Sequence, residues 1–355
     1  MKKNIAIFGG DGIGPEITNS CLKVLKAIDF HTNQLNFIQG LIGGAAFEAH
    51  GYPLPAESLT MAKSADAILF GAVGDPKYDN LNRDLRPEQA ILGLRKELGL
   101  YVNLRPAKVF TSLLSASTIK SEVLKNTDIL IVRELLEDVY FGEPRGILNQ
   151  ENDIQAVNTM VYHKSTIQCV AKLSFELANA RKQKVTSIDK ANVLEVSELW
   201  RQSVNEIARE FPNIQLNHMY VDNASMQLIK CPSEFDVILC GNLFGDILSD
   251  EAAMITGSIG LIPSASLNQQ KKGLYEPIHG SAPDIAGKGI ANPIATILSA
   301  AMMFRYSLAD ELTAIKIEKS VEKTLEQGFR TEDIFSEGNQ LVNCEQITDQ
   351  IIANL

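Results

Sequence analysis

The sequence predicts an α/β fold, in which buried strands alternate with helices along the chain. Apolar runs at 4–8, 66–70, 129–133 and 235–240 have the length of buried strands, and helical patterns follow several of them. Polar side chains recur where these strands end. Because open α/β sheets bind ligands beyond the carboxyl ends of their strands, these side chains are the first candidates for a functional site.

Composition restricts the class of protein. The 355 residues suffice for two domains or one large α/β unit, and a hydrophobic content of 45% is ordinary for a soluble enzyme. A net charge of −10 argues against a nucleic-acid-binding surface, and no apolar segment is long enough to span a membrane. The five cysteines form no Cys-x-x-Cys pair, and no signal peptide is visible. We therefore expect a cytoplasmic protein with reduced thiols.

The glycine-rich turn at 9–16 follows the first strand. Pro15 and Glu16 suit the start of the next helix. The turn is not a dinucleotide-binding fingerprint, because Pro15 stands where the third glycine of Gly-x-Gly-x-x-Gly would be needed. A Rossmann fold is therefore not predicted.

Asp246 and Asp250 follow the strand at 235–240 and lie four residues apart on a predicted helix. Their carboxylates share one face, where two negative charges repel each other. A hard dication such as Mg²⁺ or Mn²⁺ would neutralise them, since it prefers oxygen ligands. A solvated helix face is the alternative.

Arginines stand at three element ends. On the predicted helix 87–96, Arg95 shares a face with an acid and two aliphatic side chains, Glu88, Ile91 and Leu92. That face suits a pocket for a small alkyl group and a carboxylate, or else an amphipathic surface helix. Arg105 and Arg133 need anionic partners, because arginine keeps its charge. Substrate carboxylates and structural salt bridges both remain open.

Three further side chains complete the set. Tyr140 lies in an aromatic stretch at 139–146 that is typical of a strand and turn in a hairpin arm, or it is a packed aromatic residue. Lys190 and Asp222 end two more predicted strands.

Residues 257–266 are predicted as loop, and the long loop at 275–293 is typical of a functional segment. Helices are expected from 293 to 328 and near the C-terminus.

Four motifs, at 10–16, 189–192, 242–250 and 279–288, carry a resemblance that covers the whole chain. The chain resembles the metal-dependent β-decarboxylating dehydrogenases, the family of isocitrate and isopropylmalate dehydrogenases. The resemblance implies a non-Rossmann α/β fold with a large mixed sheet shared by two domains. Residues 1–100 plus 257–355 would bind the cofactor. Residues 101–256 would form the middle domain, with the hairpin arm, the dimer interface and the metal and substrate site.

Among these enzymes, the resemblance is to those that act on 3-isopropylmalate. It implies NAD-dependent oxidative decarboxylation of (2R,3S)-3-isopropylmalate to 4-methyl-2-oxopentanoate and CO₂, in leucine biosynthesis. Lys190 of the partner subunit would be the base and Tyr140 the acid, and Arg95, Arg105 and Arg133 would bind the carboxylates. Mg²⁺ or Mn²⁺ would be held by Asp246, Asp250 and Asp222 of the partner subunit, in a homodimer that shares its active sites.

The resemblance also assigns the remaining contacts. The alkyl group would meet Glu88, Ile91 and Leu92, together with Val193 of the partner subunit. NAD would be bound by residues of three loops, namely Ile13, Gly74, Glu276, His279, Gly280, Ala282, Asp284 and Asn292. Asp284 would select NAD over NADP, because a carboxylate repels a 2′-phosphate.

Two alternatives stay open. The first is a homoisocitrate or tartrate/D-malate type of dehydrogenase, and the second is a non-catalytic relative that binds metal and dicarboxylate. The chain also departs from the family pattern: Leu136-Glu137-Asp138 replaces Thr-Gly-Gly, and Asp75 stands where glycine is common. Both departures add negative charge near the expected site of an anionic substrate.

Overall fold

A computed structural model describes residues 2–29, 34–150 and 153–355 and divides the chain into two compact units. The terminal unit comprises Met1–Leu100, Val109–Ser121 and Thr256–Leu355, and the middle unit comprises Tyr101–Lys108 and Glu122–Ile255. The segment Val109–Ser121 belongs to the terminal unit, although it lies within 101–256, the range predicted for the middle domain. No helix in the described ranges is long and apolar enough to cross a membrane.

The terminal unit has a mixed arrangement of strands in the order β2-β1-β3-β12-β11. β1, β2, β3 and β12 run parallel to their neighbours, and β11 is antiparallel to β12. Its strands are β1 Lys3–Gly10, β2 Leu35–Gly40, β3 Ala67–Ala72, β11 Pro263–Leu267, β12 Gly273–Pro277 and the small pair β13 Phe329–Arg330 and β14 Gln340–Leu341. Its helices are α1 Gly14–Asp29, α2 Gly43–His50, α3 Ala56–Ser64, α4 Glu88–Glu97, α10 Ile294–Tyr306, α11 Glu311–Glu326 and α12 Cys344–Ala353.

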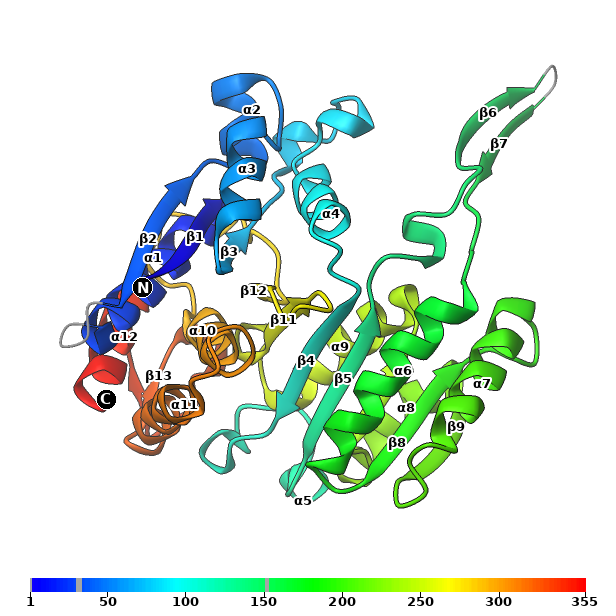
Figure 1. The fold of residues 1–355 in the computed structure, drawn as a ribbon. Helices are drawn as coiled ribbons and strands as arrows, with labels where there is room; N and C mark the ends of the chain where they lie inside the picture. The colour runs from blue at the N-terminus through cyan, green and yellow to red at the C-terminus, as the bar shows by residue number, and fades with distance from the viewer. Residues whose placement is uncertain (1, 30–33, 151–152) are drawn as a thin grey trace. The chain divides into compact units, whose positions relative to one another are not determined.

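The middle unit has strands in the order β4-β5-β10-β8-β9, with β4 antiparallel and the other four parallel. These strands are β4 Val102–Lys108, β5 Asp128–Glu134, β8 Lys184–Asp189, β9 Gln215–Tyr220 and β10 Val237–Cys240, and β6 Gly146–Gln150 pairs with β7 Asp153–Val157 as a separate hairpin. Its helices are α6 Lys164–Asn179, α7 Glu195–Ala208, α8 Val221–Lys230 and α9 Asn242–Thr256, and the short α5 Ser121–Leu124 lies at the boundary of the units. Helices α6 and α7 cover one face of this sheet, and α8 and α9 cover the other (Figure 1).

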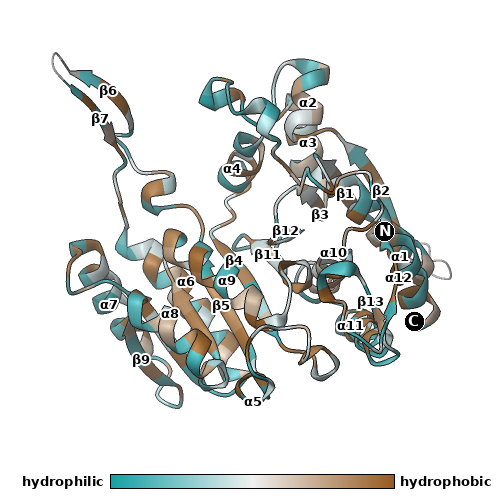
Figure 2. Ribbon diagram, turned by 180° about the vertical axis from the view of Figure 1, so that it is seen from behind, coloured by the Kyte–Doolittle hydropathy of each residue, from teal (hydrophilic) through white to brown (hydrophobic). Residues whose placement is uncertain are grey.

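Burial explains why these middle-unit segments take their forms. All four residues of β10 are buried, as expected for a parallel strand that is covered on both faces. Along α6, Ile167, Val170, Ala171 and Phe175 recur at helical spacing and are all buried. The Phe175 ring stacks on Phe211 with centroids 5.3 Å apart. Strand β5 is coloured largely as hydrophobic in Figure 2, which agrees with a core built on the sheet.

The secondary structure predicted around Tyr140 and at 257–266 was wrong. Tyr140 lies in a 3₁₀ helix, Asp138–Tyr140, and the hairpin begins only at Gly146. The reason is that Gly142 and Pro144 interrupt the aromatic run before the strand starts. The stretch 257–266 is largely not loop, because it contains the 3₁₀ turn Ile259–Leu261 and most of β11, whose residues are all buried.

A buried carboxyl group ends strand β5. Glu134 is fully buried and accepts hydrogen bonds from the backbone N–H groups of Leu136, at 2.6 Å, and Glu137, at 3.1 Å. Burial raises the pKa of Glu134 to about 7, and the two backbone donors only partly offset this shift. The carboxyl group therefore holds the first turn of the loop that leads to Tyr140.

This raised pKa predicts a pH-dependent stability. Between the ordinary glutamate pKa and about 7, the folded state binds a proton that the unfolded state has lost, so the free energy of unfolding falls as pH rises through this range. The loss is up to a few kcal/mol, since one pKa unit corresponds to about 1.4 kcal/mol. Urea unfolding of wild type and Glu134→Gln from about pH 5 to about pH 8 measures it. The variant should show a smaller slope than wild type and than Glu122→Gln, an exposed control; equal slopes would contradict the assignment.

Candidate active site

Parallel strands bring several candidate side chains to one edge of the middle unit. β5, β10, β8 and β9 are neighbours and point the same way, so their carboxyl ends lie at the same edge. Arg133 stands next to the last residue of β5, and Lys190 follows β8 directly. Strand β9 ends at Tyr220, and Asp222 lies two residues later, in the first turn of α8.

Helix α9 presents Asp246 and Asp250 to the arginines. Asp246 accepts hydrogen bonds from the Arg133 guanidinium and from the Tyr140 hydroxyl, the latter at 2.5 Å. Arg105 lies 3.3 Å from Asp246 and 3.6 Å from Asp250, measured from Nη1 to the nearest carboxylate oxygen. The structure therefore joins Arg105, Arg133, Tyr140 and both aspartates in one cluster.

Neutral side chains also accept hydrogen bonds from the two guanidinium groups and so fix their orientation. Arg105 donates from Nε to Asn103, at 2.6 Å, and from Nη1 to Ser249, at 2.7 Å. Arg133 donates from Nε and Nη2 to the Asn242 side-chain oxygen, at 3.0 and 2.6 Å. Only 1% of the Arg133 side chain is exposed. Such fixed guanidinium groups present their remaining donors in a defined direction, which suits the recognition of carboxylates.

Asp250 is the more exposed of the two acids, with 56% of its side chain accessible. Its pKa is raised, mainly because it is partly desolvated and also because it faces the negative charge of Asp246; Arg105 and Arg133 act in the opposite direction. The pair thus combines two nearby negative charges with partial desolvation. Oxygen donors in that state fit a hard dication.

Lys190 and Asp222 form a second pair at the same edge. The Lys190 ammonium donates to the Asp222 carboxylate at 2.5 Å, and this hydrogen bond lowers the pKa of Asp222. The ammonium also lies 5.9 Å from the centre of the Tyr220 ring. Val193, three residues after Lys190, is 64% exposed.

Within the described parts of one chain, no group of three His, Cys, Asp or Glu side chains is arranged to hold a metal ion. Asp246 and Asp250 therefore form a pair without Asp222 in the single chain. The donor set still fits Mg²⁺ or Mn²⁺, because these ions often take only one or two carboxylates from a protein chain.

Helix α4 carries four candidates in the terminal unit. Arg95 is buried, and its Nη2 lies 3.3 Å from Glu276, a predicted cofactor residue in β12. Ile91 and Leu92 are partly buried, and Glu88 is exposed. A side chain at Gly74 would come within 2.7 Å of the Glu88 carboxylate, so this loop and α4 meet there.

The glycine-rich turn and the long loop meet in the terminal unit. The Ile13 N–H donates to the Ser281 carbonyl at 2.8 Å, and the Ser281 hydroxyl donates to the Gly74 carbonyl at 2.6 Å. A Cβ atom on Gly12 would stand 2.0 Å from the Ser281 carbonyl oxygen, so only glycine fits. Ile13 itself is buried, and Ala282 packs against its cluster. The structure thus brings Ile13, Gly74 and the segment at 280–282 together.

The other predicted cofactor residues differ in environment. Asp284 and Gly280 are exposed. His279 Nδ1 lies 2.9 Å from the Gly280 carbonyl oxygen, its Nε2 is buried without a partner among the described residues, and burial lowers its pKa. Asn292 is buried: it accepts from the Ile294 N–H at 3.0 Å and donates to Asp333 at 3.0 Å, which indicates a structural role at the start of α10.

Sequence reasoning missed Asp11. Its buried carboxylate accepts from three backbone N–H groups, those of Gly44, at 2.8 Å, Ala45, at 2.9 Å, and Gly74, at 2.9 Å. It therefore fixes the start of α2 and the loop after β3. An acid between two glycines was the available signal, but only the folded chain shows which amides it meets.

Asp75, which stands where glycine is common in the family, has a local structural role. Its carboxylate accepts from the Lys77 N–H at 2.9 Å and caps a 3₁₀ turn.

Comparisons with known proteins agree over the full chain. The family model described as isocitrate/isopropylmalate dehydrogenase matches residues 4–351. A 3-isopropylmalate dehydrogenase from Acinetobacter baylyi is 55% identical over 359 residues, covering 100% of both chains. One from Aquifex aeolicus is 54% identical over 357 residues, covering 100% of this chain and 98% of the other.

Solved structures agree with the fold. Isocitrate dehydrogenase from Methylococcus capsulatus superposes with a TM-score of 0.88 at 32% identity over 99% of each chain. A beta-decarboxylating dehydrogenase from Thermococcus kodakarensis gives a TM-score of 0.78 at 34% identity over 99% of this chain and 96% of that one. The predicted fold class, an α/β protein with a large mixed sheet and no Rossmann fold, is confirmed. The chain therefore belongs to the isocitrate/isopropylmalate dehydrogenase family.

Proposed function

We propose that the protein catalyses NAD-dependent oxidative decarboxylation of (2R,3S)-3-isopropylmalate to 4-methyl-2-oxopentanoate and CO₂, as a step of leucine biosynthesis. The observation that carries this proposal is the cluster of Arg105, Arg133 and Tyr140 around Asp246, in a chain more than half identical to relatives named 3-isopropylmalate dehydrogenase. Within one unit, the cluster supplies two arginines to bind a dicarboxylate, a tyrosine hydroxyl to donate a proton, and carboxylate oxygens to bind a metal ion.

Substrate carboxylates are bound by arginine in this proposal. Arg105 and Arg133 are buried and fixed by Asn103, Ser249 and Asn242, so their orientation does not depend on the substrate. Arg95 of α4 is the third, and it would exchange part of its contact with Glu276 for a carboxylate. Preorganised donors of this kind lose little entropy when the anion binds.

Proton transfer is assigned to two residues. The partner's Lys190 would accept the proton of the substrate hydroxyl, and Tyr140 would donate a proton to C3 after CO₂ leaves. Tyr140 already donates to Asp246 at 2.5 Å, so its hydroxyl is held beside the metal-binding acids. When bound at Asp246, Asp250 and Asp222 of the partner subunit, Mg²⁺ or Mn²⁺ supplies Lewis-acid polarisation of the substrate oxygens. NAD, when bound, accepts the hydride.

The same proposal assigns the remaining residues. Glu88, Ile91, Leu92 and the partner's Val193 would surround the isopropyl group. NAD would lie along the loops that carry Ile13, Gly74, Glu276, His279, Gly280, Ala282, Asp284 and Asn292. Support for these loops as one site comes from the bonds between Ile13, Ser281 and Gly74.

Exposed apolar side chains support a homodimer built from the middle unit. Met226 of α8, Ile247 of α9 and Met254 of α9 are 61%, 56% and 51% exposed. Ile147 and Ile154 of the β6–β7 hairpin are 74% and 68% exposed. Large apolar side chains left exposed on α8, α9 and the hairpin favour a buried interface. In such a dimer, Lys190 and Asp222 of each subunit would complete the site of the other.

A substrate panel with a metal control tests the reaction. NADH absorbance should rise with 3-isopropylmalate and NAD when Mg²⁺ or Mn²⁺ is present, and EDTA should abolish the signal because two carboxylates would lose their shared cation. Isocitrate, homoisocitrate, D-malate and tartrate should give kcat/KM values lower by about 100-fold or more, since an apolar wall cannot hold another polar group and D-malate has no alkyl group to fill it. A preference for any of these acids, or no NADH with the whole panel, would refute the proposal.

Asp284 gives the test of cofactor choice. Asp284→Lys should lower the ratio of kcat/KM for NAD over that for NADP by about 100-fold, because a carboxylate repels the 2′-phosphate and an ammonium attracts it. Initial rates with each cofactor at saturating 3-isopropylmalate measure the ratio. Lys288→Asp, a charge change at another exposed position of the same loop, is the control. An unchanged ratio in Asp284→Lys would refute the role of Asp284.

A further inference from the structure

We propose that Asp138 is a positioning residue that fastens the loop of Tyr140 to the N-terminus of α9, and so sets Tyr140 against Asp246. The inference rests on the proposed function of Tyr140. It concerns one of the residues that depart from the family pattern, and it assigns that residue a part in the reaction.

The backbone at Asp138 is unusual for a residue with a side chain. Its φ is 75°, in the left-handed region, and only 1% of the residue is exposed. This conformation is strained for most residues, and glycine, asparagine and aspartate tolerate it best. A buried aspartate in a costly conformation needs compensating hydrogen bonds.

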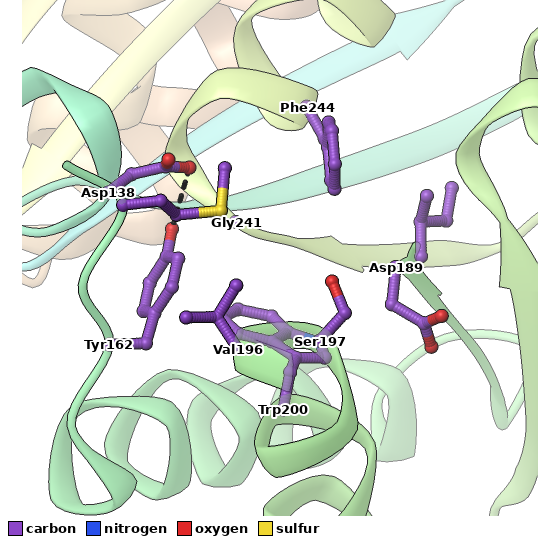
Figure 3. A pocket seen from close by; sticks show the side chains of 10 residues that line it. Asp138, Tyr162, Asp189, Val196, Ser197, Trp200, Gly241 and Phe244 are labelled. Carbon is purple, nitrogen blue, oxygen red and sulfur yellow. Dashed lines mark hydrogen bonds between the residues drawn. The ribbon is translucent and has the colours of Figure 1, made fainter. Parts of the chain in front are cut away.

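The Asp138 carboxylate makes those bonds to three elements. Oδ1 accepts from the Val139 N–H at 2.7 Å within its own 3₁₀ helix. Oδ2 accepts from the Leu243 N–H at 3.0 Å, at the start of α9, and from the Tyr162 hydroxyl at 3.1 Å. Figure 3 shows the Tyr162 hydroxyl directed at Asp138. The first N–H groups of a helix have no partner inside it, and its N-terminus attracts negative charge.

Tyr162 extends the same connection. Its hydroxyl oxygen accepts from the Asn242 N–H at 2.7 Å while it donates to Asp138. A Cβ atom on Gly241 would stand 2.7 Å from this hydroxyl, so glycine makes room for it. Asn242 in turn donates from its side chain to the Glu137 carbonyl at 3.1 Å. The first two residues of α9 are therefore capped from the segment that carries Tyr140.

The consequence is a fixed geometry between acid and metal ligand. Tyr140 lies two residues after Asp138, and Asp246 lies one helical turn after Asn242. The contact between Tyr140 and Asp246 closes a ring of hydrogen bonds that runs through Asp138 and the start of α9. Without the carboxylate, the loop and the helix would be joined at fewer points, and Tyr140 would leave its position beside Asp246.

The test compares Asp138→Gly with Asp138→Asn. Glycine keeps the left-handed backbone and removes the acceptor, whereas asparagine tolerates the backbone and keeps an acceptor for the Leu243 N–H. We expect Asp138→Gly to lower kcat for 3-isopropylmalate by about 10-fold to 100-fold and to lower KM with it, because the slowed step follows CO₂ release, and we expect Asp138→Asn to recover most of kcat. Gln183→Gly, at another left-handed residue of the middle unit, should leave both constants unchanged.

A transient measurement separates positioning from general damage. Because Tyr140 acts after hydride transfer, Asp138→Gly should show a burst of about one NADH per active site followed by slow turnover. Fluorescence of Trp200, the single tryptophan, which lines the cavity beside Tyr162, checks the fold. Tyr162→Phe serves as a second variant with the same expected burst, because it removes the hydroxyl that joins Asp138 to Asn242.

Wild-type kcat in Asp138→Gly and in Tyr162→Phe would overturn the inference, as would a loss of kcat without the burst. Tyr140→Phe distinguishes the two proposals. If Tyr140→Phe keeps wild-type kcat, the proposed acid is wrong. If Tyr140→Phe loses kcat and the two positioning variants do not, only the inference fails.

Discussion

The contact between Asp246 and the two arginines is the interaction on which the rest of the middle unit's polar edge depends. Arg105 and Arg133 are buried and cannot lose their charge, so each requires an anion or several acceptors. A buried charge without a partner would cost several kcal/mol. Asp246 supplies the anion, and α9 must start at Asn242 to bring it there. Electrostatics therefore contributes, together with packing, to the position of α9.

Charge balance explains how one cluster can hold both substrate and metal. The two arginines and the two aspartates are neutral together. A dication and a dicarboxylate add equal and opposite charges, so their joint binding leaves the balance unchanged. Either ligand alone would leave an excess of about two charges in a partly desolvated place. Each should therefore favour the binding of the other.

Much of this arrangement could be predicted from the sequence. Strands β5 and β10 appear as apolar runs, and strands were also predicted to end at Lys190 and Asp222. Because parallel strands bring their ends to one edge, Arg133, Lys190 and Asp222 were found from position alone. The fastening residues could not be found this way. Ser249 and Asn242, which hold Arg105 and Arg133, lie more than 100 residues further along the chain, and such contacts are not visible in the sequence.

The errors have physical reasons as well. Tyr140 was placed in a strand because aromatic residues favour strands, but the left-handed backbone of Asp138 starts a 3₁₀ helix instead. Glu137 and Asp138 looked like added negative charge near the site. Glu137 in fact accepts from the His163 N–H at 2.8 Å and the Thr166 hydroxyl at 2.9 Å, and Asp138 is bonded to α9. The sequence shows the sign of a residue's charge, but only the folded structure shows which groups bind that charge.

Mixed dimers test most directly whether acids and bases of two subunits build each site, as proposed. Asp246→Asn and Lys190→Met are each expected to be inactive alone. After joint unfolding and refolding in equal amounts, half of the dimers would be hybrids with one intact site each, so activity should return to about a quarter of the wild-type value. Mixtures that stay inactive, although hybrid dimers are seen by mass, would contradict a site shared between subunits.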